Sequence, residues 1–397
     1  MVGSGKRLVG LIYAKRTARG LTGCMALDSY VTLGRSGLRV SPFTLGTMTF
    51  GEDNGWGAPP ADAEAMLDEY LSRGGNSIDT ANIYTLGHSE KIVGDYFATR
   101  PGLRDRIVLG TKFFANLWPG DPNGGSSGRK SMIKQLEDSL RRLRTDYVDL
   151  YWLHNWDPAV PIEETMRALD DLVAAGKVRY VGVSDLPAWK AAEADLVARF
   201  RGWSPVIAMQ VEYSLLERTP EGEPLPMAAE RGIGVLPWGP LRGGLLSGKF
   251  SRRRPTPGAE APRPGEGGST GGGNDSTRGW VRATEADYAV LDVLDEVADE
   301  AGVAPAAVAL SWVRNRPAIT STLIGARRLD QLKANLDAID VQLSEGQVDR
   351  LDEASAPKLN FPAENNRHLA PGLAFAGATV DGVATAVHPA LQGTITR

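Results

Sequence analysis

Eight short apolar runs, each followed by a polar loop and an amphipathic stretch, place the strongest constraint on how this chain can fold. Strands buried on both faces, as in a parallel sheet covered by helices, read as nearly continuous apolar runs of this kind. Eight such strand–helix units predict a closed (β/α)8 TIM barrel. The alternative is an open doubly wound sheet, which calls for a G-x-G-x-x-G turn after the first strand, and "LGTMTFGEDNG" lacks that turn. The predicted strands are FTLGTMTF (43–50), NSIDT (76–80), RIVLGTKF (106–113), YVDLYWLH (147–154), VRYVGVSD (178–185), VIAMQVEYS (206–214), GIGVLPWGP (232–240) and STLIGA (321–326).

The stretches between these runs carry helical periodicity, with apolar residues recurring every three or four positions. The clearest are residues 62–74, 131–143 and 161–177, the last with a proline near its start and a glycine near its end. Ahead of the first barrel strand, residues 30–42 read as two short strands around a Ser-Gly turn, which predicts an N-terminal β-hairpin cap.

Three segments depart from this rhythm, and the barrel itself is assigned to residues 27–355. Residues 251–279 are rich in Gly, Pro and Ser and cannot bury enough apolar surface to offset the entropy cost of ordering, so we expect a long flexible loop after the seventh strand. The tail, residues 356–397, is predicted to be irregular and is a candidate cover for the barrel mouth. Residues 1–26 are interpreted as a disordered N-terminal extension, with Met25 as the natural initiator.

Composition excludes several classes of function. The net charge is −4 and the pI about 5.7, so no broad basic field attracts nucleic acid or anionic lipid, and we expect neither partner. One cysteine and four scattered histidines indicate no disulfide and no metal site. No apolar stretch approaches the ~18 residues that cross a bilayer. Lys15, Arg16 and Arg19 interrupt the apolar core that a secretory signal needs, so we expect a cytoplasmic protein.

Polar side chains follow three consecutive predicted strands. Asp79 ends the second strand with Tyr84 five residues beyond it, Lys112 ends the third, and His154 ends the fourth. Active sites of such barrels lie at the carboxyl ends of the strands, so these four side chains are expected to converge. Each has an ordinary explanation alone, since a strand-ending lysine can snorkel to the surface and a histidine can be structural.

Together the four groups suggest proton transfer to a carbonyl oxygen. A free tyrosine has a pKa near 10, and a neighbouring ammonium is expected to lower the pKa of Tyr84. Asp79 would keep Lys112 charged and aimed, and His154 would hold a carbonyl oxygen beside the phenol. The sequence therefore predicts Tyr84 as a general acid in carbonyl reduction.

The motifs "DTANIYTLGHSE", "VLGTK", "DLYWLH", "GVSD", "MQVEYSLL", "LPWGPLRGGLLSGK" and "LIGARRLDQLKANL" occur in series, and in this the chain resembles the aldo-keto reductase family. It resembles most the branch that includes voltage-gated potassium channel β-subunits and many bacterial reductases. The resemblance covers about residues 27–355. It implies that Asp79, Tyr84, Lys112 and His154 are a catalytic tetrad with Tyr84 as the acid.

The resemblance also implies a nicotinamide cofactor. Ser184 and Gln210 would bind the carboxamide, with Asp185 at a position where the family often has Asn, and Trp238 would stack on the ring. Some family members have Lys at position 325 and Arg at position 331, both of which reach the 2′-phosphate of NADP. This chain has neither but offers Arg327 and Arg328, so we expect NADPH in preference to NADH. The full set of expected cofactor-binding residues is Gly46, Thr47, Met48, Asp79, Ser184, Asp185, Gln210, Trp238, Gly239, Pro240, Leu241, Gly243, Leu245, Lys249, Gly325, Ala326, Arg327, Gln331 and Asn335.

Aromatic residues in the loops after the first, third and fourth strands predict a substrate pocket for an apolar or ring-bearing carbonyl compound. The expected pocket residues are Trp56, Phe113, Phe114, Trp118, Asn155 and Trp156.

The expected function is NADPH-dependent reduction of an aldehyde or ketone to an alcohol. Two alternatives remain open at this point. One is a non-catalytic NADP-binding sensor or channel-associated subunit on the same fold. The other is a lyase that uses Lys112 as a Schiff-base nucleophile, which would require the lysine to have no carboxylate partner. The sequence leaves the physiological substrate, the preferred direction and the oligomeric state undetermined.

Overall fold

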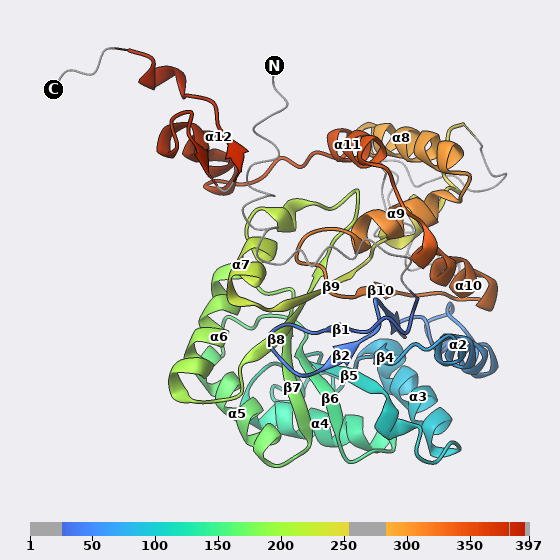
Figure 1. Ribbon diagram of the computed structural model, residues 1–397. Coiled ribbons are helices and arrows are strands. Elements are labelled where there is room, and N and C mark those ends of the chain that lie inside the picture. The colour runs from blue at the N-terminus through green and yellow to red at the C-terminus, as the bar shows by residue number, and fades with distance from the viewer. Residues whose placement is uncertain (1–25, 254–282, 381, 394–397) are drawn as a thin grey trace.

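The chain folds as a (β/α)8 barrel in the computed structural model, which describes residues 26–253, 283–380 and 382–393 (Figure 1). Eight parallel strands form one sheet in the order β10-β3-β4-β5-β6-β7-β8-β9. The sheet closes where the segment before β10 meets β9, since the amides of Thr320 and Ser321 both donate to the Val235 carbonyl, at 2.8 and 3.4 Å. The barrel strands are β3 (Phe43–Gly46), β4 (Ser77–Asp79), β5 (Val108–Phe113), β6 (Val148–Leu153), β7 (Val178–Ser184), β8 (Val206–Glu212), β9 (Gly234–Trp238) and β10 (Thr322–Ile324).

Helices surround the sheet and bury their apolar faces against its outer surface (Figure 1). Each predicted strand and each of the three predicted helices is present, so the barrel prediction is confirmed. The described helices are α2 (Pro60–Ser72), α3 (His88–Ala98), α4 (Arg129–Leu143), α5 (Ile162–Ala174), α6 (Ala188–Arg201), α7 (Pro224–Arg231), α8 (Glu285–Ala301), α9 (Pro305–Arg314), α10 (Leu329–Asp337), α11 (Glu345–Ala354) and α12 (Ala363–Ala374). None of the helices in the described ranges is long and apolar enough to span a membrane.

The predicted N-terminal hairpin is also confirmed. Its strands β1 (Val31–Thr32) and β2 (Arg39–Val40) pair antiparallel, and Leu33 and Val40 are fully buried. These two side chains join one apolar cluster with Val108, Leu150 and Leu236 from the barrel interior. The hairpin therefore closes the amino end of the barrel and leaves chemistry to the carboxyl end.

The C-terminal tail differs from its prediction. Residues 363–374 form helix α12 instead of an irregular segment, and β11 (Thr379–Val380) pairs with β12 (Val383–Ala384). Helix α12 stands apart from the barrel beyond α7 in Figure 1 and does not cover the strand ends. A proline at position 371 argues against a helix, but it lies in the last turn, where only one backbone bond is lost. The predicted extension and most of the predicted loop after the seventh strand, residues 1–25 and 254–279, lie outside the described residues.

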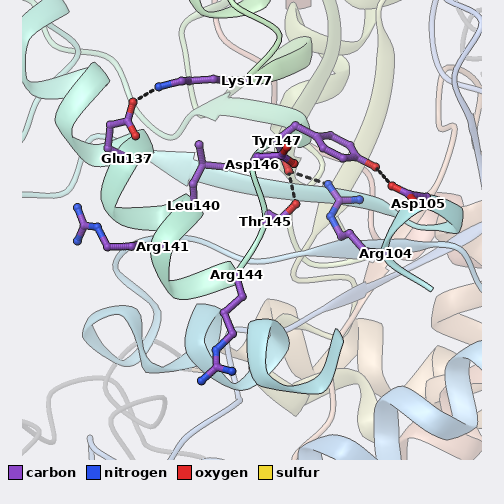
Figure 2. Close-up of a pocket in the computed structure, with 10 residues that line it drawn as sticks. All are labelled: Arg104, Asp105, Glu137, Leu140, Arg141, Arg144, Thr145, Asp146, Tyr147 and Lys177. Atoms are coloured by element: carbon purple, nitrogen blue, oxygen red, sulfur yellow. Dashed lines mark hydrogen bonds and ion pairs between the residues drawn. The ribbon is translucent and has the colours of Figure 1, made fainter. Parts of the chain in front are cut away.

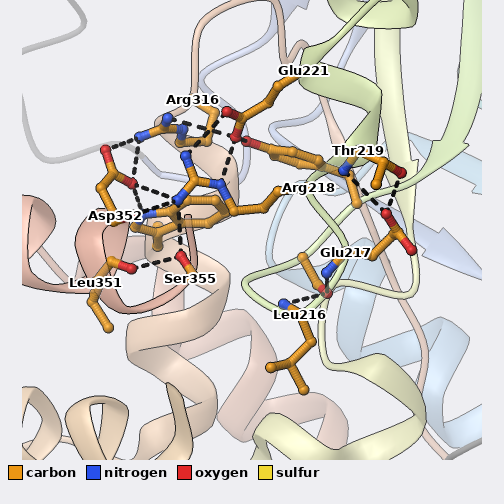
Figure 3. Close-up of polar contacts among 12 residues, drawn as sticks. Leu216, Glu217, Arg218, Thr219, Glu221, Arg316, Leu351, Asp352 and Ser355 are labelled. Carbon is orange, nitrogen blue, oxygen red and sulfur yellow. Dashed lines mark hydrogen bonds and ion pairs between the residues drawn. The ribbon is translucent and has the colours of Figure 1, made fainter. Parts of the chain in front are cut away.

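A buried ionic network fastens the last part of the barrel to α11 (Figure 3). Arg218, which is 4% exposed, donates to Glu221 at 2.7 and 3.1 Å and to the Ser355 hydroxyl at 2.8 Å. Arg316 donates to both carboxylate oxygens of Asp352, at 3.0 and 2.9 Å. Both guanidinium groups also lie over the Trp312 ring, with their carbons 5.0 and 4.6 Å from its centroid, so the charges are both paired and stacked.

The hollow shown in Figure 2 lies at the amino ends of β5, β6 and β7 and has a volume of about 680 Å³. Several of its charged groups are already paired, among them Lys177 with Glu137 and Arg104 with Asp149. The side chains predicted to do chemistry all lie elsewhere, after the opposite ends of the strands.

Trp152 on β6 fills the barrel interior because its neighbours have no side chains. A Cβ added at Gly182 on β7 would lie 2.2 Å from Trp152 Cε3, and one added at Gly110 on β5 would lie 2.8 Å from Trp152 Nε1. The indole is 1% exposed. It forms a floor beneath the polar groups at the barrel mouth.

The Gly182→Ala substitution should therefore destabilise the fold. Its methyl group would overlap the indole, and overpacking of this kind costs about 1–3 kcal/mol in the free energy of unfolding. Urea denaturation measures the change. Gly37→Ala is the matched control, because a Cβ at Gly37 meets nothing within 4 Å. Equal stability of the two variants would contradict the role given to Trp152.

Candidate active site

Lys112 is the centre of the polar cluster at the barrel mouth. Its side chain points into the barrel from β5 and is 1% exposed. The amine donates to Asp79 Oδ2, to the Thr80 carbonyl at 2.8 Å and to the Tyr84 hydroxyl at 3.0 Å. An ammonium group has three protons, so each one has an acceptor.

Asp79 is held from two further directions. Its Oδ1 accepts from Gln210 Nε2 at 2.9 Å, and Gln210 comes from β8 on the other side of the barrel. Its backbone carbonyl accepts from the Thr47 amide at 2.9 Å. The carboxylate is thereby fixed with one oxygen toward Lys112 and the other toward Gln210.

Tyr84 is positioned by a strained turn that follows β4. Thr85 and Leu86 have φ of 45° and 54°, in the left-handed region that side chains with a Cβ seldom adopt. The Thr85 hydroxyl donates to the Phe50 carbonyl at 2.8 Å and accepts from the Ser89 amide at 3.0 Å, which holds the turn in place. Strain of this kind persists where surrounding bonds over-determine it, often at functional sites.

His154 lies directly after β6, where its amide donates to the Phe113 carbonyl at 3.1 Å. Its ring stands almost perpendicular to the Tyr84 ring, with centroids 6.1 Å apart. The imidazole makes no hydrogen bond to another described residue, so its nitrogens are available to a ligand between it and the phenol.

Burial shifts the pKa values of these groups. Burial lowers the pKa of His154 to about 3, with the charge of Lys112 acting in the same direction, so the imidazole is neutral at physiological pH. Burial opposes the charged amine of Lys112, but Asp79 and Tyr84 together outweigh it and raise the pKa of Lys112 above its usual value. The pKa of the Asp79 carboxyl is raised by burial, against the opposing effect of Lys112.

The expected direction for Tyr84 is wrong. Burial raises the pKa of the Tyr84 phenol above its usual value, and the charge of Lys112 only partly opposes this. The phenol is therefore protonated at neutral pH, as a proton donor must be. The paired amine of Lys112 also argues against the Schiff-base alternative, since a protonated lysine is not a nucleophile.

The residues expected beside a nicotinamide ring lie together at the carboxyl ends of β7, β8 and β9. Asp185 has φ of 54°, a conformation that Asp and Asn tolerate better than most residues. Its carboxylate accepts from the Ser184 hydroxyl at 3.0 Å and from Trp238 Nε1 at 3.1 Å. The side-chain amide of Gln210 donates one of its two protons to Asp79.

The segment after β9 bends at three glycines with positive φ. Gly239, Gly243 and Gly244 have φ of 66°, 59° and 98°, a conformation that glycine adopts without steric cost. Residues 242–247 form the 3₁₀ segment η4 (Arg242–Ser247). Of the other residues predicted here, Pro240 and Leu245 are buried, Leu241 is half-buried and Lys249 is exposed.

The junction after β10 separates the two candidate arginines. Arg328 is paired with Asp330 at 3.0 Å, whereas the Arg327 guanidinium has no partner among the described residues. The Arg327 amide donates to Gln331 Oε1 at 3.1 Å, and Asn335 Nδ2 donates to the Gly325 carbonyl at 3.1 Å. These two bonds tie the loop to α10.

The same junction is joined to the loop after β3. The Thr49 hydroxyl donates to the Ala326 carbonyl at 2.6 Å. A Cβ added at Gly325 would meet only the Gly46 carbonyl oxygen, at 3.8 Å, so space is open there. Thr47 is buried and Met48 is 48% exposed.

One of the predicted substrate residues is misplaced. Phe113 follows the inward-facing Lys112 on β5 and therefore points outward, where it is fully buried against Tyr151 at 4.6 Å between ring centroids. Trp156 packs edge-on against Trp189 of α6 at 5.4 Å. Of the remaining four, Trp118 and Asn155 are exposed, and Trp56 and Phe114 are half-buried.

Two supporting contacts escaped the sequence analysis. Glu90 of α3 is fully buried, accepting from the Thr111 hydroxyl at 2.5 Å and from Arg142 Nε at 2.6 Å, and so fixes α3 against β5. Arg242 pairs with Glu212 at the end of β8. Glu90 lies among the apolar residues Ile92, Val93 and Phe97 of α3, and an acid within such a stretch is the signal that would have identified it.

The sequence profile of the Aldo/keto reductase family matches residues 42–356. The chain belongs to this family. It is accordingly an oxidoreductase that acts on carbonyl or alcohol groups. The match spans the whole barrel and ends just beyond α11.

Three relatives are similar over most of their lengths. An uncharacterized oxidoreductase of Bacillus subtilis, YrpG, is 36% identical over 79% of this chain and 92% of its own. An aryl-alcohol dehydrogenase [NADP(+)] of Phanerodontia chrysosporium is 35% identical over 82% of this chain and 85% of its own. Norsolorinic acid reductase B of Aspergillus parasiticus is 36% identical over 82% of this chain and 83% of its own.

The low pKa of His154 should make stability depend on pH. Between the folded pKa of about 3 and the unfolded pKa of about 6.5, the unfolded chain binds a proton that the folded chain does not. Stability should therefore fall as pH falls, by about 2 kcal/mol from pH 7 to pH 5 through this group. His154→Asn removes that contribution, and urea denaturation of both proteins at the two pH values measures it. Identical losses in both would show that His154 is not buried in the neutral form.

Proposed function

We propose that this aldo/keto reductase reduces an aldehyde or ketone to an alcohol with NADPH, and that Tyr84 is the proton donor. The observation that carries the proposal is the buried amine of Lys112, which bonds both Asp79 and the Tyr84 hydroxyl. A phenol with a raised pKa, next to a fixed cation in a largely dry site, is suited to protonate an oxygen that gains negative charge.

Four residues of the chain have separate roles in the proposed reaction. Bound NADPH supplies the hydride to the carbonyl carbon. Tyr84 donates its hydroxyl proton to the carbonyl oxygen, and Lys112 stabilises the phenolate that this leaves. Neutral His154 donates a hydrogen bond to the same oxygen and orients it. Asp79 keeps Lys112 charged and in place through the change.

The loops at the barrel mouth fit a dinucleotide. The three glycines with positive φ after β9 can bring backbone amides to a pyrophosphate. The half-buried Trp238 ring is fixed by its bond to Asp185 and presents a face for stacking. Open space at Gly325 leaves room for the end of the dinucleotide that lies away from the nicotinamide ring.

Preference for NADPH over NADH is assigned to Arg327. Its guanidinium has no partner in the described part of the chain, and it follows the strand end where the open space lies. A guanidinium can bind a phosphate with two parallel hydrogen bonds. The relative named as an aryl-alcohol dehydrogenase [NADP(+)] supports the same choice.

We further propose aryl or other ring-bearing carbonyl compounds as substrates. Trp118 and Met48 expose apolar side chains in the loops after β5 and β3. The half-buried Phe114 follows Lys112 by two residues. The name of the aryl-alcohol dehydrogenase relative points to aromatic compounds in that protein.

Replacing Tyr84 by Phe should lower kcat by about a thousandfold, because proton transfer contributes about 10²–10⁴ to such reactions. The NADPH dissociation constant, followed by quenching of tryptophan fluorescence, should stay near that of the original protein. The assay is steady NADPH oxidation with an aromatic aldehyde. Absence of turnover in the unmodified protein across a panel of aldehydes and ketones would instead favour a non-catalytic NADP-binding role.

Tyr147→Phe is the matched control for this variant. It also removes one phenolic hydroxyl, but at the opposite end of the barrel, where that hydroxyl donates to Asp105 at 2.9 Å (Figure 2). Its kcat should be unchanged. An equal loss in the two variants, or wild-type turnover in Tyr84→Phe, would refute the assignment of Tyr84.

Replacing Arg327 by Ala should weaken NADPH binding about tenfold or more while leaving NADH binding unchanged, since a charge-assisted contact contributes about 1.5–3 kcal/mol. Arg328→Ala is the control, because Arg328 is already engaged by Asp330. Fluorescence titration with both cofactors measures the effect. Equal weakening of NADPH and NADH by Arg327→Ala would rule out selective recognition of the 2′-phosphate.

A further inference from the structure

Asp185 places a carboxylate at the barrel mouth, directly after β7. The residue is exposed, so its side chain is accessible to a ligand. One oxygen accepts from the Ser184 hydroxyl at 3.0 Å and the other from Trp238 Nε1 at 3.1 Å, and both donors are neutral. Asparagine would also accept from Trp238 and would tolerate the φ of 54° at this position. Neither the backbone nor the contact with Trp238 therefore requires a carboxylate, and the charge is what distinguishes this side chain.

The charge of Asp185 is not balanced by an ion pair within the described part of the chain. Asp79, by contrast, is paired with Lys112. Burial is the main cause that raises the pKa of the Tyr84 phenol, and the charge of Asp185 acts in the same direction. A negative charge that lacks a close cation among the described residues therefore lies within electrostatic reach of the site.

The groups around Asp185 suit a primary amide such as the nicotinamide carboxamide. Asp185 and the Ser184 oxygen offer acceptors to an amide NH₂ group. The side chain of Gln210 gives one amide proton to Asp79 and has a second that can be donated to an amide carbonyl. Trp238 offers an aromatic face beside them. The residues that are present therefore fit the ring end of the cofactor that the proposed function requires.

We propose that the charge of Asp185 stabilises the oxidised nicotinamide ring in preference to the reduced ring, an inference that rests on the proposed function. In the reduction, the carbonyl carbon gains a hydride and its oxygen gains the Tyr84 proton, while the loss of that hydride leaves a positive charge on the ring. A carboxylate close to the ring favours the charged form, just as it favours the charged form of an amine. Exclusion of water by the bound ring reduces the screening of this charge. Asp185 thereby makes the bound cofactor a stronger hydride donor.

Calorimetric titration of the full chain with NADP⁺ and with NADPH tests the proposal. Asp185→Asn keeps an acceptor for Trp238 and removes the charge. It should raise the dissociation constant of NADP⁺ about tenfold, the smaller effect expected of a nearby opposite charge, and leave that of NADPH near its original value. A tenfold change in the ratio of the two constants corresponds to about 30 mV in the potential of a two-electron couple.

Asp105→Asn is the matched control for this variant. It also removes one carboxylate charge, but at the opposite end of the barrel, where Asp105 accepts from the Tyr147 hydroxyl at 2.9 Å (Figure 2). Both dissociation constants should stay at their original values. An equal change in the ratio for Asp105→Asn and Asp185→Asn would overturn the inference.

Asp185→Gly separates the charge from the contact with Trp238. Glycine tolerates the positive φ but provides no acceptor for the indole, so the ratio of the two constants should change as it does in Asp185→Asn. An unchanged ratio in Asp185→Asn would overturn the inference and leave the proposed function intact. Equal weakening of NADP⁺ and NADPH in both variants would also overturn it, since Asp185 would then only position Trp238. If the original chain binds neither form, the proposed function fails and the inference fails with it.

Discussion

The site depends on one buried ammonium. Lys112 is removed from water, and an unpaired charge there would be very costly, so all three of its protons must find acceptors. One acceptor comes from the end of β4, one from the backbone beyond it and one from the following turn. The position of Tyr84 is therefore coupled to the pairing of β4 and β5. A tilt of either strand would break the contacts of Lys112 and would at the same time move the phenol of Tyr84.

The barrel interior changes from apolar to polar along its axis, so the groups that can take part in chemistry lie at one end. At the amino end, Leu33 and Val40 of the hairpin seal an apolar layer. Trp152 lies above them, accommodated by the two glycines on the neighbouring strands. Above that floor the interior becomes polar, where Asp79 accepts hydrogen bonds from both Lys112 and Gln210. An apolar floor lowers the local dielectric, which strengthens the electrostatic contacts above it.

Much of this architecture could be predicted because strands buried on both faces leave an unmistakable apolar run, and the four polar residues at their ends stand out against it. The predictions that failed concern the direction of a side chain or the balance between opposing effects on a pKa. Phe113 was assigned to the substrate pocket although alternation along β5 turns it away once Lys112 faces inward. The direction of the Tyr84 pKa depends on how deeply the phenol is buried, which the sequence does not show. Arg327 and Arg328 are equivalent in sequence, and only the contact with Asp330 separates them.

The loop that follows β6 links His154 to α6. His154 precedes Trp156 by two residues, and the Trp156 ring packs edge-on against Trp189 of α6. Asn155, between them, accepts a hydrogen bond from the Trp156 amide at 2.9 Å. The side of the site that carries His154 is therefore positioned by packing on α6, whereas the Lys112–Tyr84 pair is positioned by hydrogen bonds at the ends of β4 and β5.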